Sequence, residues 1–393
     1  MVMMRITEKK QQVERDVLLL PEDMMMLILS KLPRKSLIRF KCVSRAWFHL
    51  ICTVCRQYYP NKSSPCHLMI VSQHQQSHRT HRFSLIHLPK EAKEETSLLP
   101  LPDAFDLKLP FFLCRPHPGK KILSSNGLVC FFFNEDVCNY AFNPITRHIL
   151  KLPHIPYHTC NVSFNAGFGY LPRRDEHKIV VWFVRDDLKM SHAASGCWVL
   201  SLKKSINGTI AVVESWRRLG VDSPPVAASF SDSFCVNGTI YWLCSYANEG
   251  TAQKQHLLLS FDLDEEAFQL RPHPSFPLTA KMVEIEGSLC VGELGFCDGH
   301  YFVLWEFKNG DYWVMKHEVN DFFHLGHRRR RLSFLACTRS KSGAKQLVFM
   351  GDDEAGGGHG RRLLSYNLQS QILRRSSEDL QPLLGDDGLY FLF

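Results

Sequence analysis

The sequence has no long hydrophobic run. No apolar stretch approaches the roughly 20 residues that a membrane-spanning helix needs. The first 16 residues are heavily charged and lack the apolar centre of a signal peptide. From these two absences we expect a soluble protein of the cytoplasm, the nucleus or both, with no membrane partner.

The familiar catalytic motifs are also missing. The chain contains neither Gly-x-Ser-x-Gly nor His-Glu-x-x-His, and its 19 histidines and 14 cysteines form no recognisable catalytic frame. Cys52, Cys55, Cys66 and His67 have the look of a zinc site, but the adjacent pair Cys66-His67 gives poor chelate geometry. We therefore predict reduced, mostly buried thiols, and no catalytic residue, metal or cofactor.

Positive charge is concentrated near the N-terminus. Residues 1–56 hold 11 Lys and Arg against 5 Asp and Glu, a net of +6, whereas residues 57–393 hold 36 against 34, a net of +2. This local excess suits an acidic protein partner and is too small to indicate nucleic acid. The basic run at 328–331 has three interpretations: a nuclear import signal, a patch for acidic ligands or a solvated loop.

Residues 17–51 carry the clearest helical signals. Pro21, followed by two acidic residues, suits the first turn of a helix. Pro33 forces the residue before it out of the helical region, so this helix ends near Leu32. A second short helix is expected at about 34–41, and Ser44 is a natural N-cap for a third.

These helices contain more apolar surface than they can hide among themselves. Met24, Leu27 and Ile28, together with Met25, are expected on one face of the first helix. A unit of roughly 40 residues is near the lower limit for independent folding. The excess favours one face buried against a partner protein; the alternative is a self-contained helical corner of a larger domain.

The same stretch resembles an F-box. The matching features, in order, are Leu20-Pro21, Ile28-Leu29, Leu32-Pro33, residues 35–40, residues 43–47 and Leu50-Ile51. The resemblance implies that this face binds the Skp adaptor and, through it, the cullin of a Skp–cullin–F-box ubiquitin ligase. The positions that match those used by the family against its adaptor are Leu20, Pro21, Ile28, Leu32, Pro33, Leu37, Val43 and Trp47.

From residue 67 onward the pattern is one of short, closely spaced strands. The turns at Asn126-Gly127, Asn237-Gly238 and Glu286-Gly287 each lead into a strand. In addition, Asn143, Asp262 and Asn367 each follow an aromatic residue at a strand end and suit tight hairpin turns. Repeated hairpins of this kind favour propeller blades around a central axis, with a β-sandwich as the alternative.

The repeat resembles the plant F-box-associated interaction domain over roughly residues 120–390. It departs from the family at Leu171, where an acidic residue usually follows Gly-Tyr, and it lacks the twin glycines of kelch repeats. The resemblance implies a domain that binds a target protein. The long polar stretches at 186–195 and 352–360 are the candidates for target specificity, although the substrate-binding residues stay unknown.

We therefore predict a small all-α F-box of three helices followed by a large all-β domain that is propeller-like. The expected organisation is a disordered tail at 1–15, the F-box at 16–56, a linker with a first hairpin at 57–118 and the β domain at 119–391, which could include 66–88. The predicted function is the non-catalytic substrate receptor of a ubiquitin ligase complex. A non-ligase scaffold, a pollen-recognition protein and, least favoured, a propeller enzyme remain as alternatives.

Overall fold

The computed structural model describes two compact units. The first comprises Met1–Lys62 with Lys204–Ile210, and the second Ser63–Lys203 with Ala211–Phe393. The described residues are 21–32, 36, 37, 40, 43, 44, 47, 50, 51, 54, 67–74, 77–87, 103–108, 121–132, 139–144, 146–156, 162–185, 196–204, 209–220, 229–247, 254–278, 280–295, 301–319, 332–339, 345–353, 360–375 and 389–392.

The first unit contains helix α2 (Glu22–Ser30), the one helix with bounds inside the described residues. Seven further residues of this unit have helical backbone: Ser36, Leu37, Phe40, Trp47, Leu50, Ile51 and Val54. The remainder of the predicted second and third helices lies outside the described residues. Ser44 does make the capping contact expected of it, because its Oγ accepts a hydrogen bond from the Trp47 N–H at 3.2 Å.

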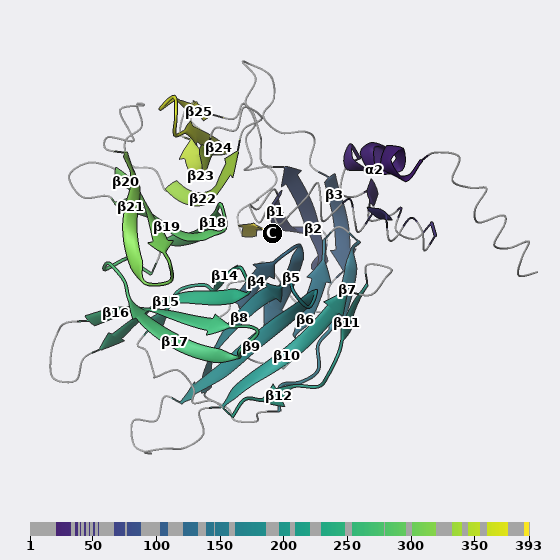
Figure 1. The fold of residues 1–393 in the computed structure, drawn as a ribbon, viewed down its shortest axis with the longest axis horizontal. Coiled ribbons are helices and arrows are strands. Elements are labelled where there is room, and N and C mark those ends of the chain that lie inside the picture. The colour runs from purple at the N-terminus through teal and green to yellow at the C-terminus, as the bar shows by residue number, and fades with distance from the viewer. Residues whose placement is uncertain are drawn as a thin grey trace, which may run out of the picture. The chain divides into compact units, whose positions relative to one another are not determined.

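The second unit is a six-bladed β-propeller, shown in Figure 1 almost along its axis. From the inner strand outward, blade 1 consists of β26 (Leu389–Leu392), β1 (His67–His74), β2 (Ser77–His87) and β3 (Asp103–Lys108), and blade 2 of β4 (Lys121–Ser125), β5 (Leu128–Phe132), β6 (Tyr140–Asn143) and β7 (His148–Lys151). Blade 3 consists of β8 (Val162–Leu171), β9 (Glu176–Arg185), β10 (Cys197–Lys204), β11 (Ile210–Val212) and β12 (Arg217–Arg218), and blade 4 of β13 (Ser229–Phe230) and β14 (Phe234–Val236), then β15 (Thr239–Ala247), β16 (Lys254–Asp262) and β17 (Ala267–Pro272). Blade 5 consists of β18 (Lys281–Ile285), β19 (Ser288–Gly295), β20 (Tyr301–Lys308) and β21 (Tyr312–Val319), and blade 6 of β22 (Leu332–Arg339), β23 (Lys345–Asp353), β24 (Gly360–Asn367) and β25 (Leu373–Arg375).

The predicted all-β class and the propeller interpretation are confirmed. Asn126-Gly127 joins β4 to β5, and Asn237-Gly238 joins β14 to β15, so the two turns hold equivalent places in different blades. Both residues of each turn have positive φ, as does the pair Glu286-Gly287. Two-residue turns of this type match the right-handed twist of the strands they connect. A two-layer sandwich would not arrange these hairpins around an axis, so the sandwich alternative is excluded.

The turns between the third and fourth strands also repeat. The side-chain oxygens of Asn143, Asp262 and Asn367 each accept backbone N–H groups two or three residues ahead, at 2.8–3.2 Å. Each turn then closes with a residue at positive φ, such as Glu266. The predicted role of these Asn and Asp residues is therefore confirmed: their side chains satisfy N–H groups that the hairpin leaves unpaired.

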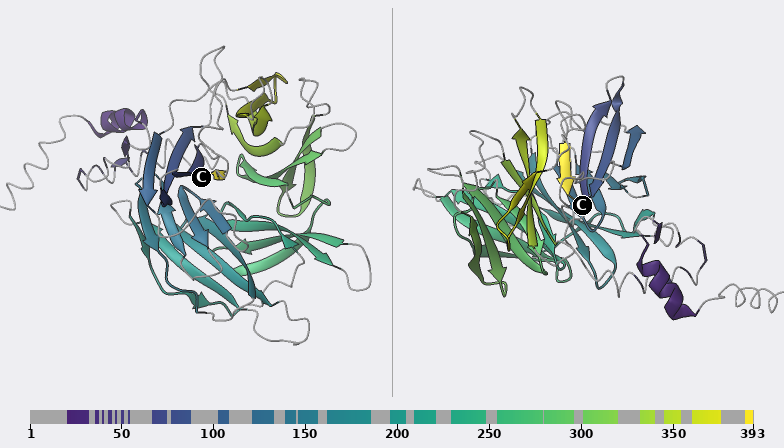
Figure 2. Two further views of the ribbon diagram at one scale, coloured as in Figure 1. Left: turned by 180° about the vertical axis from the view of Figure 1, so that it is seen from behind. Right: turned by 90° about the horizontal axis from the view of Figure 1, so that it is seen from above.

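The ring closes through strands from its two ends. Strand β26 pairs antiparallel with β1, from Leu68 opposite Leu392 to Val71 opposite Leu389. Figure 2 shows this C-terminal strand inside the ring, beside the first strands of the unit. Closure removes the exposed edge that β1 would otherwise present to solvent.

Aromatic side chains fill the spaces between blades. Trp182 of blade 3 and Trp242 of blade 4 meet edge to face, with ring centroids 4.9 Å apart, and both are fully buried. The indole N–H of Trp242 donates to the Ala166 carbonyl across the same space at 3.2 Å. Phe302, Phe334 and Phe349 form the corresponding cluster between blades 5 and 6. Both tryptophans are therefore core residues at the contact between blades 3 and 4.

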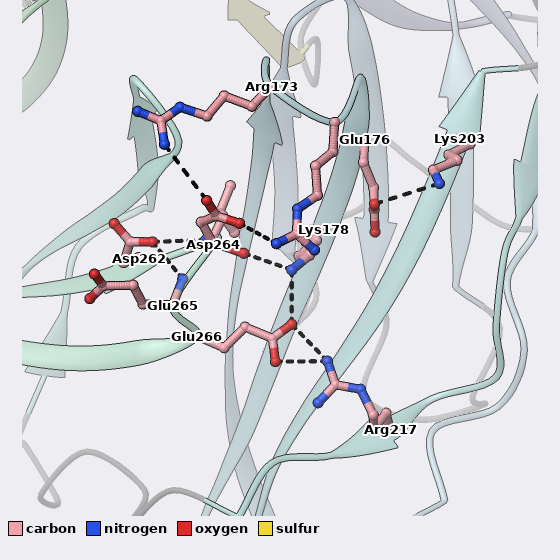
Figure 3. Close-up of polar contacts among 11 residues, drawn as sticks. Arg173, Glu176, Lys178, Lys203, Arg217, Asp262, Asp264, Glu265 and Glu266 are labelled. Atoms are coloured by element: carbon pink, nitrogen blue, oxygen red, sulfur yellow. Dashed lines mark hydrogen bonds and ion pairs between the residues drawn. The ribbon is translucent and has the colours of Figure 1, made fainter.

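Ion pairs and hydrogen bonds between charged residues join blades 3 and 4 (Figure 3). Lys178 Nζ lies 2.8 Å from Glu266 Oε1 and donates to the Leu263 carbonyl at 2.6 Å. Arg217 Nη2 lies 2.7 Å from each carboxylate oxygen of Glu266. One carboxylate of blade 4 is thus held by two cations of blade 3.

Candidate functional site

Pro21 and Ser30 lie at the two ends of helix α2 and accept or donate hydrogen bonds there. Pro21 is the N-cap, with φ −53° and ψ 146°, and its carbonyl accepts from the Met24 and Met25 N–H groups at 3.0 and 3.1 Å. The helix ends after Ser30, whose Oγ donates to the Leu27 carbonyl at 2.7 Å. The predicted stop before Pro33 therefore agrees with the observed end of α2.

The first unit has a small core of its own. Leu29, Leu37, Leu50, Ile51 and Val54 are buried together. Five further side chains cover this core partially: Met25, Met26, Leu32, Phe40 and Trp47. Met25, Met26 and Leu29 of α2, with Leu32 just after it, face this core, so one helical face is used by it. Met25 thus lies on this face and not, as expected, with Met24.

A second face of α2 is apolar and exposed. Met24, Leu27 and Ile28 are 48%, 48% and 46% exposed, although they occupy neighbouring positions at helical spacing. We call these three residues the outer face of α2. Each belongs to a residue type that is normally buried, and apolar patches of this kind are typical of surfaces that bind other proteins.

Comparison with known families settles the class of protein. The F-box domain matches residues 17–57, and the F-box associated beta propeller domain matches residues 66–377. The chain belongs to the F-box proteins with this propeller.

Curated relatives of this chain are also F-box proteins. The F-box protein At5g62660 of Arabidopsis thaliana is 26% identical over 336 residues, which are 80% of this chain and 82% of the relative. F-box protein At2g40925 of the same plant is 26% identical over 314 residues, covering 74% of this chain and 70% of the relative. The family match at residues 17–57 lies in the first unit, and the match at 66–377 lies, apart from Lys204–Ile210, in the second.

Two solved structures show distant similarity to this chain. A chain of a nidogen–laminin complex covers 79% of this chain and 93% of its own length, at 10% identity and a TM-score of 0.35. A Trypanosoma rangeli sialidase covers 63% of this chain and 47% of its own length, at 13% identity and a TM-score of 0.37. Matches this remote carry no argument about function.

The residues predicted to meet the adaptor are placed in three different environments. Pro21, Ile28 and Val43 are exposed on the F-box unit, and Val43 is the most exposed at 60%. Leu32 and Trp47 lie partly buried against the core, where the Trp47 ring meets Phe40 edge to face at 5.6 Å.

Two of those predicted residues, Leu20 and Pro33, lie outside the described residues. Leu37 is 1% exposed and belongs to the core of the F-box unit.

Met24 and Leu27 join Ile28 on the outer face of α2 but were absent from the predicted adaptor-binding set. Leu27 and Ile28 follow Met24 by three and four residues, and this helical spacing, already visible in the sequence, is the signal that would have added Met24 and Leu27 to the set.

Cysteine chemistry in the described residues is that of buried thiols. All six described cysteines are free, and five are buried: Cys130, Cys197, Cys244, Cys290 and Cys337. Burial raises the pKa of Cys197 and of Cys290 to about 12. These thiols therefore stay protonated and weakly nucleophilic at neutral pH. The prediction of buried thiols is confirmed for them, whereas Cys52, Cys55 and Cys66 lie outside the described residues.

The described part of the chain lacks two further features. No helix there is long and apolar enough to cross a membrane. No group of three or more His, Cys, Asp or Glu side chains there could hold a metal ion.

The propeller has two ends with different connections. Because neighbouring strands run antiparallel, the tight turns at Asn126-Gly127, Asn237-Gly238 and 263–266 lie at one end, the turn end. The connections after Arg185 of β9 and after Asp353 of β23 leave from the opposite end, which we call the loop end. The stretches 186–195 and 352–360, predicted to carry specificity, follow these two strands in the sequence, but residues 186–195 and 354–359 lie outside the described residues.

Proposed function

We propose that this F-box protein is the substrate-recognition subunit of a Skp–cullin–F-box ubiquitin ligase. The F-box, folded as three short helices, docks on the Skp adaptor, which links it to the cullin. The propeller binds a target protein and holds it near a ubiquitin-charged conjugating enzyme. The contribution of the chain is positioning, which makes ubiquitin transfer effectively intramolecular. We expect it to act in the cytoplasm or the nucleus.

The observation that carries this proposal is the outer face of α2. Met24, Leu27 and Ile28 are exposed on a helix whose opposite face already covers a complete small core. Their exposure costs free energy in water, and burial in a groove of a partner recovers it. The family match over residues 17–57 supports the Skp adaptor as that partner.

The test is assembly from purified components. The full chain is mixed with a Skp adaptor and then with a cullin, and the complexes are separated by size-exclusion chromatography with multi-angle light scattering. The proposal predicts a complex of all three proteins with one copy of the chain for each adaptor. A correctly folded chain that binds no adaptor would refute the proposal, and one that binds the adaptor but excludes the cullin would favour a scaffold outside ubiquitin ligases.

A further inference from the structure

Four polar side chains from four successive blades lie at the inner strands of the propeller. Lys121 is the first residue of β4, Asn165 belongs to β8, Asp232 lies between β13 and β14, and Lys281 is the first residue of β18. We call them the axial quartet. Strands β4 and β18 start at the loop end, so their two lysines lie at that end of the propeller.

The contacts of the quartet bring it together near the axis. Lys121 Nζ donates to Asn165 Oδ1 at 3.0 Å, which joins blades 2 and 3. Lys281 Nζ lies 3.5 Å from Asp232 Oδ2, which joins blades 4 and 5. Asp232 also interacts electrostatically with Lys121. Blades 2 and 5 are not neighbours in the ring. A carboxylate that interacts with a lysine of each of these blades therefore lies close to the centre of the ring.

The two lysines differ in how well water solvates them. Burial lowers the pKa of Lys121, and the charge of Asp232 opposes this shift more weakly. Within the described residues, Lys121 donates its hydrogen bond to the neutral, buried amide of Asn165. The carboxylate of Asp232 is by contrast 80% exposed and, within the described part of the chain, pairs with Lys281. A poorly solvated ammonium without a close counter-ion gains more from an incoming anion than a fully solvated one does.

We propose that the axial quartet binds an anionic side chain of the target, a carboxylate or a phosphate. The inference rests on the proposed function, because it gives a substrate class to the propeller of a substrate receptor. The anion accepts hydrogen bonds from Lys121 and Lys281 and replaces Asp232 as the counter-ion of Lys281. Asp232 can leave without a large penalty, since its side chain is already mostly in water.

The test uses libraries of synthetic peptides, because random flanking sequences can stand in for a target whose identity is unknown. Four libraries each have one fixed central residue: glutamate, phosphoserine, glutamine or serine. Each is passed over the immobilised full chain, and the retained fraction is measured by mass spectrometry. We expect the glutamate library, the phosphoserine library or both to be retained on the order of tenfold better than their neutral counterparts, as for one or two charge-assisted hydrogen bonds.

Three variants decide whether the quartet is responsible. The double variant Lys121→Met with Lys281→Met should lose the preference for the anionic libraries. The conservative pair Lys121→Arg with Lys281→Arg should keep most of it. Lys203→Met is the matched control, because Lys203 is an exposed lysine of blade 3 that pairs with Glu176. It should leave the preference unchanged.

Each outcome has a defined meaning. Retention of one anionic library alone identifies carboxylate or phosphate as the ligand. Equal retention of neutral and anionic libraries by the wild type overturns the proposal, as does an unchanged preference in a double methionine variant with a normal melting curve. If that variant does not fold, Lys281→Met alone decides, since Lys281 is exposed. Binding of the Skp adaptor is measured in parallel. A wild-type chain that does not bind the adaptor would refute the proposed function. A wild-type chain that binds the adaptor but shows no preference for anionic peptides would refute this site only.

Discussion

Lys178 of β9 and Glu266 of the β16–β17 turn form an ion pair across two blades, with Nζ and Oε1 2.8 Å apart. The Lys178 side chain is only 5% exposed and that of Glu266 17% exposed. Removing one member of such a pair leaves a charge in a poorly solvated place. The pair therefore holds blade 3 and blade 4 in one relative position.

Glu266→Gln should lower the free energy of unfolding by about 2 kcal/mol, because Lys178 keeps its charge and loses its anion. Urea denaturation followed by tryptophan fluorescence measures this change. Glu265→Gln is the control, since Glu265 is the adjacent glutamate of the same turn. A loss as large in the control as in Glu266→Gln would contradict a specific role for the pair.

The same residue predicts an acid dependence. Burial alone would raise the pKa of Glu266, but the hydrogen bonds and charges of Arg217 and Lys178 outweigh it and lower the pKa below the ordinary 4.5. A folded-state pKa below the unfolded one gives stability that is present above pH 4.5 and is lost as the pH falls through the folded-state value. Glu266→Gln should flatten this acid loss, which melting temperatures measured between pH 7 and pH 3 would reveal.

Gly167→Ala should destabilise the propeller. A Cβ at Gly167 would lie 2.2 Å from Cζ2 of the buried Trp242 ring, so blade 3 and blade 4 could not keep their present distance. Overpacking of this kind typically costs about 1–3 kcal/mol. Gly220→Ala is the control, because nothing lies within 4 Å of that position. Equal unfolding midpoints for both variants would show that Trp242 shifts freely.

Deletion of residues 389–393 should open the ring. Strand β1 then loses its partner β26 along Leu68–Val71, at roughly 1 kcal/mol for each ladder hydrogen bond. The exposed edge of β1 should also promote aggregation. Thermal unfolding with light scattering measures both effects, and deletion of Phe393 alone is the control. A truncated chain as stable and monomeric as the full one would mean that closure does not depend on β26.

Leu29→Ala tests the core of the F-box unit. Leu29 is 1% exposed, whereas its neighbour Ile28 is 46% exposed. Truncating Leu29 should therefore unfold this small unit, at a cost of about 2–5 kcal/mol, and Ile28→Ala should not. Limited proteolysis with N-terminal sequencing reports cleavage within residues 21–54. Equal protection of both variants would contradict the assignment of inner and outer faces.

Local chemistry made much of the fold predictable. Asn126-Gly127 and Asn237-Gly238 determine two-residue turns through their positive φ, and Asn143 and Asp262 determine four-residue turns through their side-chain oxygens. Ser44 was likewise recognisable as a cap. In each case the residues that decide the structure are neighbours in the sequence.

Contacts between distant residues could not be predicted in this way. The pairing of β26 with β1 joins opposite ends of the domain, and Lys178 meets Glu266 across two blades. Helix α2 presented a different difficulty, because both of its faces are apolar. The F-box resemblance placed Ile28 and Leu37 in one adaptor-binding set, but only the packed core shows that Leu37 is buried and that Ile28 is exposed.

The central claim is that the outer face of α2 binds the Skp adaptor, and calorimetric titration of the full chain with purified adaptor tests it directly. Leu27→Ala with Ile28→Ala should weaken binding by roughly a thousandfold, at about 2 kcal/mol for each anchor if the losses add. The control is Met315→Ala with Ile372→Ala, two propeller side chains with nearly the same exposure. It should bind like the wild type, and an equal Kd for the α2 variant and this control would contradict the claim.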